Sequence, residues 1–564
     1  MTLVLVLLPM LACTAGAPTG DKPDPDDTGE TDTTTDSDSA GDTDTDSDTD
    51  TCAAVGFADE PTAYTLPDAP VDWALPWYQL YQNSYDNTCA DGSIRGDADW
   101  YWGTFDLTGD GLADIVVYKD SCNGTDIGTS RWEVYENTGT GFATTPTDWA
   151  LPTASVNWTN PWYQPSEATS GNTCADGSGG GTALWYYTLL DLDGDGLVDL
   201  VVTADTCTSE DVGTSRWDVY RNTGAGFETT PTTWTLPAAP VRGDNLYYTT
   251  SASYLSRTCT DGSWSGRAAW YWTLLDLSGD GAPDLVHTVD TCDDGEIGGT
   301  LWTVYTNNGA GFDETPIDWA LPARATDASF PYITTTNTEY GRTCADGTWP
   351  SQAGYAFTTL DIDGDAAPDL VHTYALCVGT DVGADRWAVY RNNGGGFDAS
   401  PTDWPVPATS VGGWPWILHA EDTTWAECAD GSARNQAWYH TLMDLTGDTL
   451  PDLVVTWDEC TGREVGTDFW TVYPNNGAGF DATGLEWNLP TSSVSTSLTW
   501  YRTSISNWGA TCTDGTQAGT ADHAFSVFRL DDDEFPDLVL TVDSCGDDEA
   551  GVTHWNLYPG TCGS

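Results

Sequence analysis

The chain has 564 residues and carries 87 acidic against 17 basic side chains, which gives a formal net charge of −70. Such an excess of negative charge repels phosphate groups, so binding to nucleic acid and docking on anionic lipid are both disfavoured. The length allows several domains or one large repeat architecture, and the internal repetition described below favours the repeat architecture.

Residues 1–13 form a short apolar segment that ends at Cys13. The segment is too short for a permanent membrane-spanning helix, and it predicts a secretory signal peptide. Its last residues, Met10-Leu-Ala-Cys13, resemble the bacterial lipoprotein signal, in which the cysteine is lipidated. We therefore expect an exported protein that a lipid on Cys13 holds at the bacterial outer membrane or cell surface. Plain secretion with an incidental cysteine is the alternative.

A disordered acidic tether is predicted over residues 14–51. Residues 20–51 consist almost wholly of Asp, Thr, Ser, Gly and Pro, without an aromatic or a β-branched apolar residue. Such a composition cannot bury enough apolar surface to offset the entropy cost of ordering. The segment is therefore expected to be a solvated spacer.

Residues 52–564 contain six copies of a unit with a period of 84 or 85 residues. The period is seen in the cysteines that precede an Asp-Gly pair: Cys89, Cys174, Cys259, Cys344, Cys428 and Cys512. Four short strands without helical periodicity are predicted in the second unit, over residues 185–190, 199–203 and 216–220 and in a segment that ends at residue 237. Four strands per unit is typical of a propeller blade. The sequence therefore predicts an all-β fold, a six-bladed β-propeller.

The two ends of the chain share one blade in this prediction. Residues 56–67 match residues 141–152, so the repeat region begins where a unit passes from its third to its fourth strand. Residues 555–562 stop at the corresponding end of a third strand. A ring closed in this way leaves no free sheet edge. Because Cys52 and Cys562 fall at this junction, we expect them to form a disulfide.

The cysteines between these two occur twice in each unit, 32 or 33 residues apart. Even numbers of cysteines in an exported chain favour disulfides over metal thiolates. The predicted pairs are Cys89–Cys122, Cys174–Cys207, Cys259–Cys292, Cys344–Cys377, Cys428–Cys460 and Cys512–Cys545. An exchange of partners between neighbouring units is the alternative.

An acidic loop of nine residues also recurs in each unit; loops 1 to 6 begin at residues 106, 191, 276, 361, 444 and 529. Loop 2 reads Asp191-Leu-Asp193-Gly-Asp195-Gly-Leu-Val-Asp199. The carboxylates at positions 1, 3, 5 and 9 converge only if the chain curls tightly, which glycine permits because it reaches positive φ without steric cost. Converging carboxylates repel one another unless a cation lies among them. Flexible coordination by six to eight oxygens favours Ca²⁺ over Mg²⁺.

The loop, the apolar strand after it and a following Asn-x-Gly-x-Gly-Phe turn resemble the FG-GAP/VCBS repeat family, the integrin-α-like β-propellers. The first copy comprises residues 106–114 and 137–142. The resemblance implies blades that carry Ca²⁺ loops, although the cysteine-bearing segment makes these units longer than typical blades of the family. The implied metal ligands are Asp106, Thr108, Asp110, Asp114, Asp191, Asp193, Asp195, Asp199, Asp276, Ser278, Asp280, Asp284, Asp361, Asp363, Asp365, Asp369, Asp444, Thr446, Asp448 and Asp452.

Loop 6 departs from the pattern, because Arg529 replaces the first Asp and Glu534 replaces the turn glycine at position 6. A guanidinium there could pair with Asp533 or Asp537 and stand in for the metal. We therefore expect about five Ca²⁺ sites and a sixth loop without metal.

Loops 1 to 5 are not expected to bind equally. Loop 2 has the most charge and both glycines, so it should be the tightest site. Ala366 in loop 4 and Thr449 in loop 5 replace the turn glycine, which would weaken binding if that position requires positive φ. Asp-capped turns without metal are the alternative for all the loops.

Other acids and the tryptophans also follow the repeat. One acid follows each first cysteine and another lies six residues before each third-strand tryptophan; turn hydrogen bonds explain them more simply than further ion or ligand sites do. Tryptophans at one place in each unit, such as Trp132, are expected to form the core. Five less regular ones could form a platform for stacking sugars: Trp158, Trp162, Trp414, Trp416 and Trp425.

The sequence offers little sign of catalysis. It contains no serine-hydrolase elbow, zinc-protease motif or phosphate loop, and only His287 and His372 among six histidines share a place in the repeat. Carboxylates that recur in every unit indicate metal sites, whereas a catalytic acid/base pair is expected once. We therefore expect no enzyme; a polysaccharide lyase or hydrolase is the alternative.

The leading interpretation is a monomeric, surface-anchored and calcium-stabilised propeller that acts as a binding or adhesion module. Its partner would be a protein or a glycan at the cell surface. A calcium-dependent, lectin-like propeller with glycan held between blades by aromatic residues is the second interpretation, and a structural envelope protein is a third. The fold alone does not decide among them.

Overall fold

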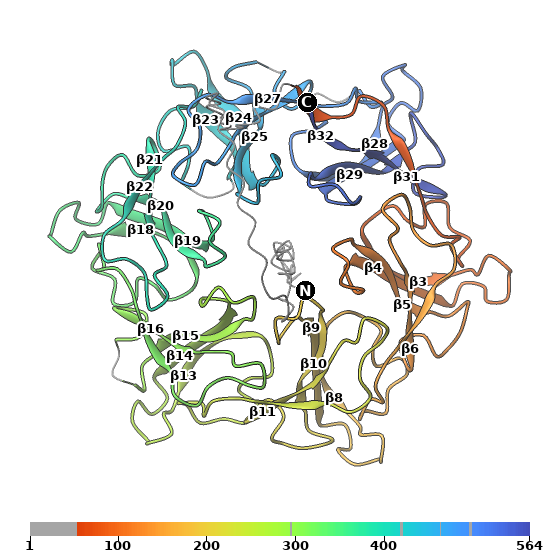
Figure 1. Cartoon of the computed structure of the whole chain (residues 1–564), viewed down its shortest axis with the longest axis horizontal. Helices are drawn as coiled ribbons and strands as arrows, with labels where there is room; N and C mark the ends of the chain where they lie inside the picture. The colour runs from red at the N-terminus through yellow and green to blue at the C-terminus, as the bar shows by residue number, and fades with distance from the viewer. Residues whose placement is uncertain (1–53, 294–295, 418–420, 463, 496–498, 564) are drawn as a thin grey trace, which may run out of the picture.

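The computed structural model describes residues 54–563 except residues 294–295, 418–420, 463 and 496–498. The predicted signal peptide, the lipidated Cys13, the tether and the disulfide partner Cys52 lie outside the described residues. The described part forms β-strands and no helix, and the strands build six sheets arranged radially around a central axis, as in a β-propeller (Figure 1). It follows that no helix of the described part is long and apolar enough to cross a membrane. The predicted all-β class is confirmed.

Three sheets follow one another along the first half of the chain, each with five antiparallel strands. Sheet 1 contains β3 (Tyr81–Asn87), β4 (Ala98–Phe105), β5 (Asp114–Asp120), β6 (Arg131–Tyr135) and β7 (Thr147–Ala150). Sheet 2 contains β8 (Glu167–Asn172), β9 (Ala183–Leu190), β10 (Asp199–Asp205), β11 (Arg216–Tyr220) and β12 (Thr232–Thr235). Sheet 3 contains β13 (Ser251–Arg257), β14 (Ala268–Leu275), β15 (Asp284–Asp290), β16 (Leu301–Tyr305) and β17 (Ile317–Ala320).

The remaining sheets complete the ring. Sheet 4 contains β18 (Thr336–Arg342), β19 (Ala353–Leu360), β20 (Asp369–Ala375), β21 (Arg386–Tyr390) and β22 (Thr402–Pro405). Sheet 5 has seven strands: β23 (Glu421–Glu427), β24 (Arg434–Met443), β25 (Asp452–Asp458), β26 (Phe469–Tyr473), β27 (Leu485–Asn488), β1 (Ala54–Phe57) and β32 (Gly560–Gly563). Sheet 6 contains β28 (Ser504–Ala510), β29 (Ala521–Phe528), β30 (Asp537–Asp543), β31 (His554–Tyr558) and β2 (Thr62–Thr65).

Strands from the two ends of the chain lie in one sheet, as the repeat pattern predicts. In sheet 6, β2 runs antiparallel to β31, with Tyr64 opposite Trp555. The pattern did not predict that β1 and β32 would extend sheet 5. There β1 pairs in parallel with β27, through Gly56 and Asn488, and antiparallel with β32.

The predicted count of four strands per unit is wrong, because each sheet has an additional strand in the cysteine-bearing segment. These strands are β3, β8, β13, β18, β23 and β28. In β8 the sequence Glu-Ala-Thr-Ser-Gly-Asn is largely exposed, so it lacks the apolar alternation by which a strand is recognised. Pairing with the aromatic-rich β9 holds it in the sheet.

Apolar cores lie between neighbouring sheets, and the tryptophans of the fourth strand of each sheet are their centres. Trp132 is 0% exposed, and its indole N–H donates to the carbonyl of Trp162, from the next unit, at 2.6 Å. Phe227, from the Asn-x-Gly-x-Gly-Phe turn of the second unit, lies edge-on to Trp132 with ring centroids 5.7 Å apart. The same bond from Trp555 in sheet 6 to the carbonyl of Trp77 connects the last unit to the first.

The expectation of a sugar platform is wrong for two of the five tryptophans. Trp162 and Trp416 are 0% exposed, because both occupy the aromatic position whose carbonyl accepts the indole bond. Trp158 and Trp414 are 37% and 41% exposed. The side chain of Trp425 lies outside the described residues.

All six predicted disulfides within the units are present, so exchange between units does not occur. They are Cys89–Cys122, Cys174–Cys207, Cys259–Cys292, Cys344–Cys377, Cys428–Cys460 and Cys512–Cys545. Each connects the start of the segment before the second strand to the end of the third strand. Six disulfides are typical of an exported protein.

Candidate metal loops and an aromatic boundary

Each acidic loop connects the second and third strands of its sheet, and its first and fifth residues shape the turn. In loop 2, Asp191 accepts hydrogen bonds from the amides of Gly194 at 2.9 Å and Gly196 at 3.0 Å. Asp195 accepts one from the amide of Leu197 at 2.9 Å. Gly194 and Gly196 adopt φ of +74° and +86°, which permits the tight curl.

The aspartate at position 9 connects each loop to its neighbours. Asp199 begins β10, is 1% exposed, and accepts a hydrogen bond through Oδ1 from the backbone amide of Asn222 at 2.8 Å. The side-chain amide of Asn222 in turn donates to the carbonyl of Leu107 in loop 1 at 2.9 Å. Five asparagines make this bond to the preceding loop, at 2.7–2.9 Å: Asn137, Asn222, Asn307, Asn392 and Asn475. Gly560 takes their place beside loop 6, so no such amide joins loop 6 to loop 5.

Loops 2 and 4 contain an ion pair that loops 1, 3 and 5 do not. Arg221 pairs with Oδ2 of Asp193, and Arg391 pairs with Oδ2 of Asp363. The two aspartate side chains are only 5% and 6% exposed. Their other oxygens, Oδ1, are buried without a hydrogen-bond partner among the described residues.

The position-9 aspartates divide the loops in the same way. In loops 2 and 4, the Oδ2 atoms of Asp199 and Asp369 are also buried without a partner. In loop 1, Oδ2 of Asp114 accepts from the amides of Leu107 and Thr108, both at 3.1 Å. Loops 3 and 5 repeat this arrangement. Loops 2 and 4 thus retain two unpartnered carboxylate oxygens each, whereas loops 1, 3 and 5 satisfy the position-9 carboxylate internally. In loops 1 and 5 the hydroxyls of Thr108 and Thr446 are the buried oxygens without a partner among the described residues.

The carboxylates of loops 2, 4 and 6 are gathered closely. Three carboxylates with oxygen atoms within 4.8 Å of one another occur in each: Asp191, Asp193 and Asp195; Asp361, Asp363 and Asp365; Asp531, Asp533 and Asp537. Burial raises the pKa of Asp199 and of Asp369 to about 7. Oxygen ligands of this kind suit Ca²⁺, and in loops 2 and 4 the unpartnered oxygens provide acceptors that a cation would satisfy. The residues of these two loops therefore fit the ion.

The expected role of Arg529 in loop 6 is not seen. Its Nη2 lies 4.0 Å from Oδ1 of Asp532, an exposed residue, and no ion pair of Arg529 with Asp533 or Asp537 occurs. The pair is absent although both carboxylates belong to the described residues. Loop 6 nevertheless fixes its position-9 carboxylate as loop 1 does, because Asp537 accepts from the amide of Leu530 at 2.9 Å.

The turn position adopts positive φ in loops 1 to 5, as expected, whereas Glu534 at this place in loop 6 does not. The glycines of loops 1 to 3 have φ of +86° to +87°, and Ala366 and Thr449 have φ of +69° and +72°. Nothing lies within 4 Å of a Cβ placed on Gly111, Gly196 or Gly281. The free-energy cost of a side chain there therefore comes from the positive φ of the backbone and not from contact with neighbouring atoms.

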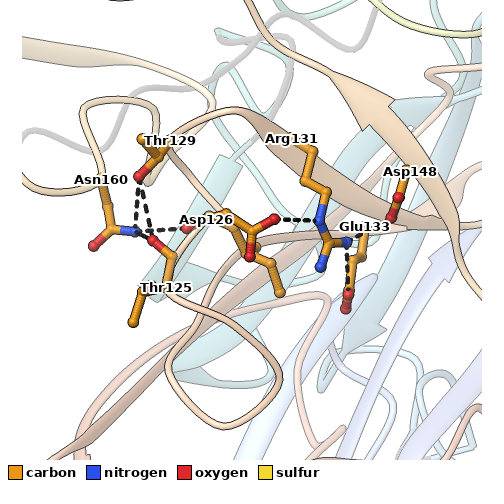
Figure 2. A network of polar contacts seen from close by, with 8 residues as sticks. Thr125, Asp126, Thr129, Arg131, Glu133, Asp148 and Asn160 are labelled. Carbon is orange, nitrogen blue, oxygen red and sulfur yellow. Dashed lines mark hydrogen bonds and ion pairs between the residues drawn. The ribbon is translucent and has the colours of Figure 1, made fainter.

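The acids that follow the first cysteines serve turns, as expected. Asp91 accepts a hydrogen bond from the amide of Ser93 at 2.8 Å, and the acids after the other first cysteines do the same. The acid six residues before the β6 tryptophan behaves differently, because Asp126 forms an ion pair with Arg131 at 2.8 Å; Arg131 also reaches Glu133 at 2.8 Å and Asp148 at 2.6 Å (Figure 2).

Exposed aromatic residues line the boundaries between sheets. At the boundary of sheets 1 and 2, Trp158 lies edge-on to Tyr163 with centroids 5.4 Å apart, and Tyr163 lies 5.8 Å from Tyr101. At the boundary of sheets 6 and 1, Trp73 contacts Tyr78, which contacts Trp508. At the boundary of sheets 4 and 5, Trp414 contacts Tyr374, which contacts Tyr340.

The histidines at the shared strand position are buried among aromatic rings. His287 and His372 are 1% and 3% exposed. Burial lowers the pKa of His287 to about 3 and that of His372 to about 4. Both are therefore neutral core residues at neutral pH.

No protein-family model matches the chain, and no curated protein is significantly similar to it. Among solved structures, it is similar to the Tc holotoxin pore of Photorhabdus luminescens, at 15% identity and a TM-score of 0.39 over 89% of this chain and 15% of that one. It is also similar to an Agrocybe aegerita lectin that recognises non-reducing terminal N-acetylglucosamine, at 16% identity and a TM-score of 0.32 over 84% and 83%. A third likeness is to BBS1N in complex with ARL6DN, at 12% identity and a TM-score of 0.23 over 88% and 98%. The chain spans about 15% of the length of the toxin chain, and likenesses this weak assign no function.

Proposed function

We propose that the chain is a calcium-stabilised propeller of the FG-GAP/VCBS kind, with six blades, that acts as a surface-anchored binding or adhesion module. The seven-stranded sheet 5 counts as one of the six blades, since β23 to β27 repeat the order of the other sheets and β1 and β32 are added at its edge. The main support is the set of unpartnered, buried carboxylate oxygens in loops 2 and 4.

Calcium would act here as a structural ion. Asp191, Asp193, Asp195 and Asp199 would hold it in loop 2, and the corresponding residues would hold it in loop 4. Loops 1, 3 and 5 are proposed as weaker sites because their position-9 carboxylates already accept backbone amides. The ion offsets the repulsion among the carboxylates, so its gain appears as stability of the folded ring.

Thermal unfolding of the full chain tests this part of the proposal. Calcium should raise the melting temperature above its value in chelator, and magnesium at the same concentration should raise it less, because Mg²⁺ demands tighter octahedral geometry. Identical melting curves in calcium, magnesium and chelator would contradict it.

The binding role, in preference to catalysis, is supported by how the polar residues are used. The recurrent acids are engaged in turns and loops, and the strand histidines His287, His372 and His523 are buried in the core. Chemical crosslinking on intact cells should recover a protein partner if adhesion is its role. Turnover of a polysaccharide by the purified chain would instead establish an enzyme.

Surface anchoring depends on Cys13. Growth with a fatty-acid probe should label the full chain and leave a Cys13→Ser variant unlabelled. An unlabelled wild-type product would show that the protein is secreted without a lipid.

Glycan binding is the second candidate, and the aromatic clusters at the sheet boundaries favour it. Trp73, Trp158 and Trp414 are each at least 36% exposed and contact a tyrosine. Exposed aromatic rings beside polar groups are typical of small-ligand sites. Capture on a glycan array in calcium, with loss in chelator, would favour this candidate over a protein partner.

A further inference from the structure

A small hollow lies at the boundary of sheets 1 and 2. Its volume is about 220 Å³, and its lining includes Asp99, Lys119, Asp120 and Thr125 from the first unit and Thr159 and Asn160 from the second. Asn160 is held by bonds from its side-chain amide to the carbonyl of Ile127 at 2.6 Å and to Thr129 (Figure 2). The hollow is therefore bounded on the second-unit side by a fixed polar residue.

Two charged residues of the hollow occur together only in the first unit. Lys119 pairs with Asp99 at 2.7 Å, and it is one of two lysines in the chain. The second unit has Leu184 and Ala204 at these places, and the third has Ala269 and Val289. Because a residue pair that serves the sheet would recur with the sheet, this pair requires another explanation.

The side chain of Asp120 does not face the open part of the hollow. It is 1% exposed, and its Oδ1 accepts from the amides of Cys122 and Asn123. Asp120 lies opposite Trp100, which contacts Trp77, whereas Lys119 lies opposite Tyr101, which contacts Tyr163. Neighbouring residues of a strand point to opposite faces, so the polar groups that the hollow offers at the boundary of sheets 1 and 2 are those of the Asp99–Lys119 pair.

An aromatic surface adjoins these polar groups. The ammonium of Lys119 lies 5.4 Å from the ring centroid of Tyr101, and the chain of contacts continues through Tyr163 to the exposed Trp158. Aromatic faces combined with a few fixed polar groups suit a ligand that has apolar C–H faces and hydroxyls at its edges. Two carboxylates against one ammonium, on a chain of net charge −70, disfavour an anionic ligand.

We propose that the hollow binds one neutral sugar residue of a glycan. The Asp99–Lys119 pair offers the sugar hydroxyls an acceptor and a donor, and Trp158 with Tyr163 contacts the C–H face. This inference depends on the glycan-binding version of the proposed function and specifies its site.

The test is an array of neutral and sialylated glycans probed with the full chain in calcium. Asp99→Leu with Lys119→Ala copies the residues of the second unit, so the variant should fold, and its melting temperature checks this. Trp158→Gly copies the third unit, which has Gly243 there. Trp264→Gly is the matched control, because Trp264 is 54% exposed, belongs to none of the boundary clusters, and is replaced by Gly179 in the second unit.

Wild-type protein should capture neutral glycans. The double variant and Trp158→Gly should lose at least 10-fold in capture, and Trp264→Gly should lose little. Equal capture by the folded double variant, or capture of sialylated glycans only, would overturn the site while glycan binding stands. No capture at all by wild-type protein that still gains stability from calcium would overturn the site together with the glycan-binding candidate and leave a protein partner.

Discussion

Loops 2 and 4 differ from loops 1, 3 and 5 in the residue at position 3 and in the groups that hydrogen-bond or pair with their carboxylates. Loops 2 and 4 have Asp193 and Asp363 at position 3. Each of these aspartates pairs with the arginine that precedes the turn asparagine, Arg221 in loop 2 and Arg391 in loop 4. Loops 1, 3 and 5 have Thr or Ser at position 3 and Glu136, Thr306 or Pro474 where the arginine would be. Among loops 1 to 5, an aspartate at position 3 thus occurs only together with an arginine in the following turn; loop 6 has Asp531 at position 3 but Pro559 at the place of the arginine.

The comparison suggests what the arginine does. In loop 2 it holds Oδ2 of Asp193 and leaves Oδ1 directed to the other carboxylates, which is how a group behind a metal ligand orients that ligand. The guanidinium also offsets part of the negative charge of the loop. Under the proposed function, loops 2 and 4 would therefore be prepared to bind calcium, whereas loops 1, 3 and 5 are turns that hold together through backbone amides.

The largest effect should follow from removing the position-3 carboxylates of both prepared loops. Asp193→Asn with Asp363→Asn should abolish the two tight sites. At calcium 100-fold above the dissociation constant each site contributes about 2.7 kcal/mol, so the variant should lose roughly 5 kcal/mol of calcium-dependent stability. Thr108→Ala with Thr446→Ala changes the same position in loops 1 and 5 and should lose much less. Denaturant unfolding with and without chelator measures both, and equal losses would remove the distinction between the two kinds of loop.

Removing one arginine should weaken one loop. Arg221→Ala should lower calcium affinity at loop 2 by about 10- to 100-fold, because groups that orient metal ligands contribute that much. Thr306→Ala, at the same place in the third unit, should leave the affinity of loop 3 unchanged. Calorimetry distinguishes the two variants. Tighter binding by Arg221→Ala would show that the guanidinium competes with the ion.

The stability of the chain should also depend on pH through a buried histidine outside the loops, and this contribution must be measured before the loops are compared at different pH. His372 is buried and its pKa is lowered to about 4, so below its unfolded value of 6.5 the unfolded chain binds a proton that the folded chain does not. Its contribution to stability is therefore complete above pH 6.5 and is lost as the pH falls toward 4. His372→Leu, which copies Leu540 of the sixth unit, should remove this loss, about 2 kcal/mol at pH 5. Melting in chelator at pH 5 and pH 7.5 should show a gain for the variant mainly at pH 5; an equal gain at both would assign it to packing.

The smallest effect should come from the turn position. Ala366→Gly in loop 4 and Thr449→Gly in loop 5 relieve a positive φ and should each stabilise the chain by about 1 kcal/mol. The reverse change, Gly196→Ala, should cost a similar amount in loop 2, where space for a Cβ exists. If Ala366→Gly leaves the calcium affinity of loop 4 unchanged, then the backbone strain does not limit binding there.

Much of the fold could be predicted because the repeat restates it six times. The disulfide pairs followed from spacing, the acidic loops from their recurrent motif, and the meeting of the two chain ends in sheet 6 from the match of residues 56–67 with residues 141–152. The additional strand of each sheet could not be predicted, since a polar segment such as β8 joins its sheet through backbone pairing and not through an apolar pattern.

Three features of the site were not predicted, for different reasons. Trp162 and Trp416 follow the repeat, because aromatic residues recur at their place as Trp77, Tyr247, Tyr332 and Trp500, so the signal was present. The turn asparagines, such as Asn222, also recur, but a bond from one loop to the carbonyl of the preceding loop depends on the placement of neighbouring sheets. The contact of Arg529 with Asp532 instead of Asp533 likewise depends on side-chain placement.

Calorimetric titration of the decalcified full chain with calcium tests the central claim most directly. Two tight sites should be seen, assigned to loops 2 and 4 by their loss in Asp193→Asn and Asp363→Asn, followed by about three weaker ones. Six equal sites, or no binding, would contradict this account of the loops.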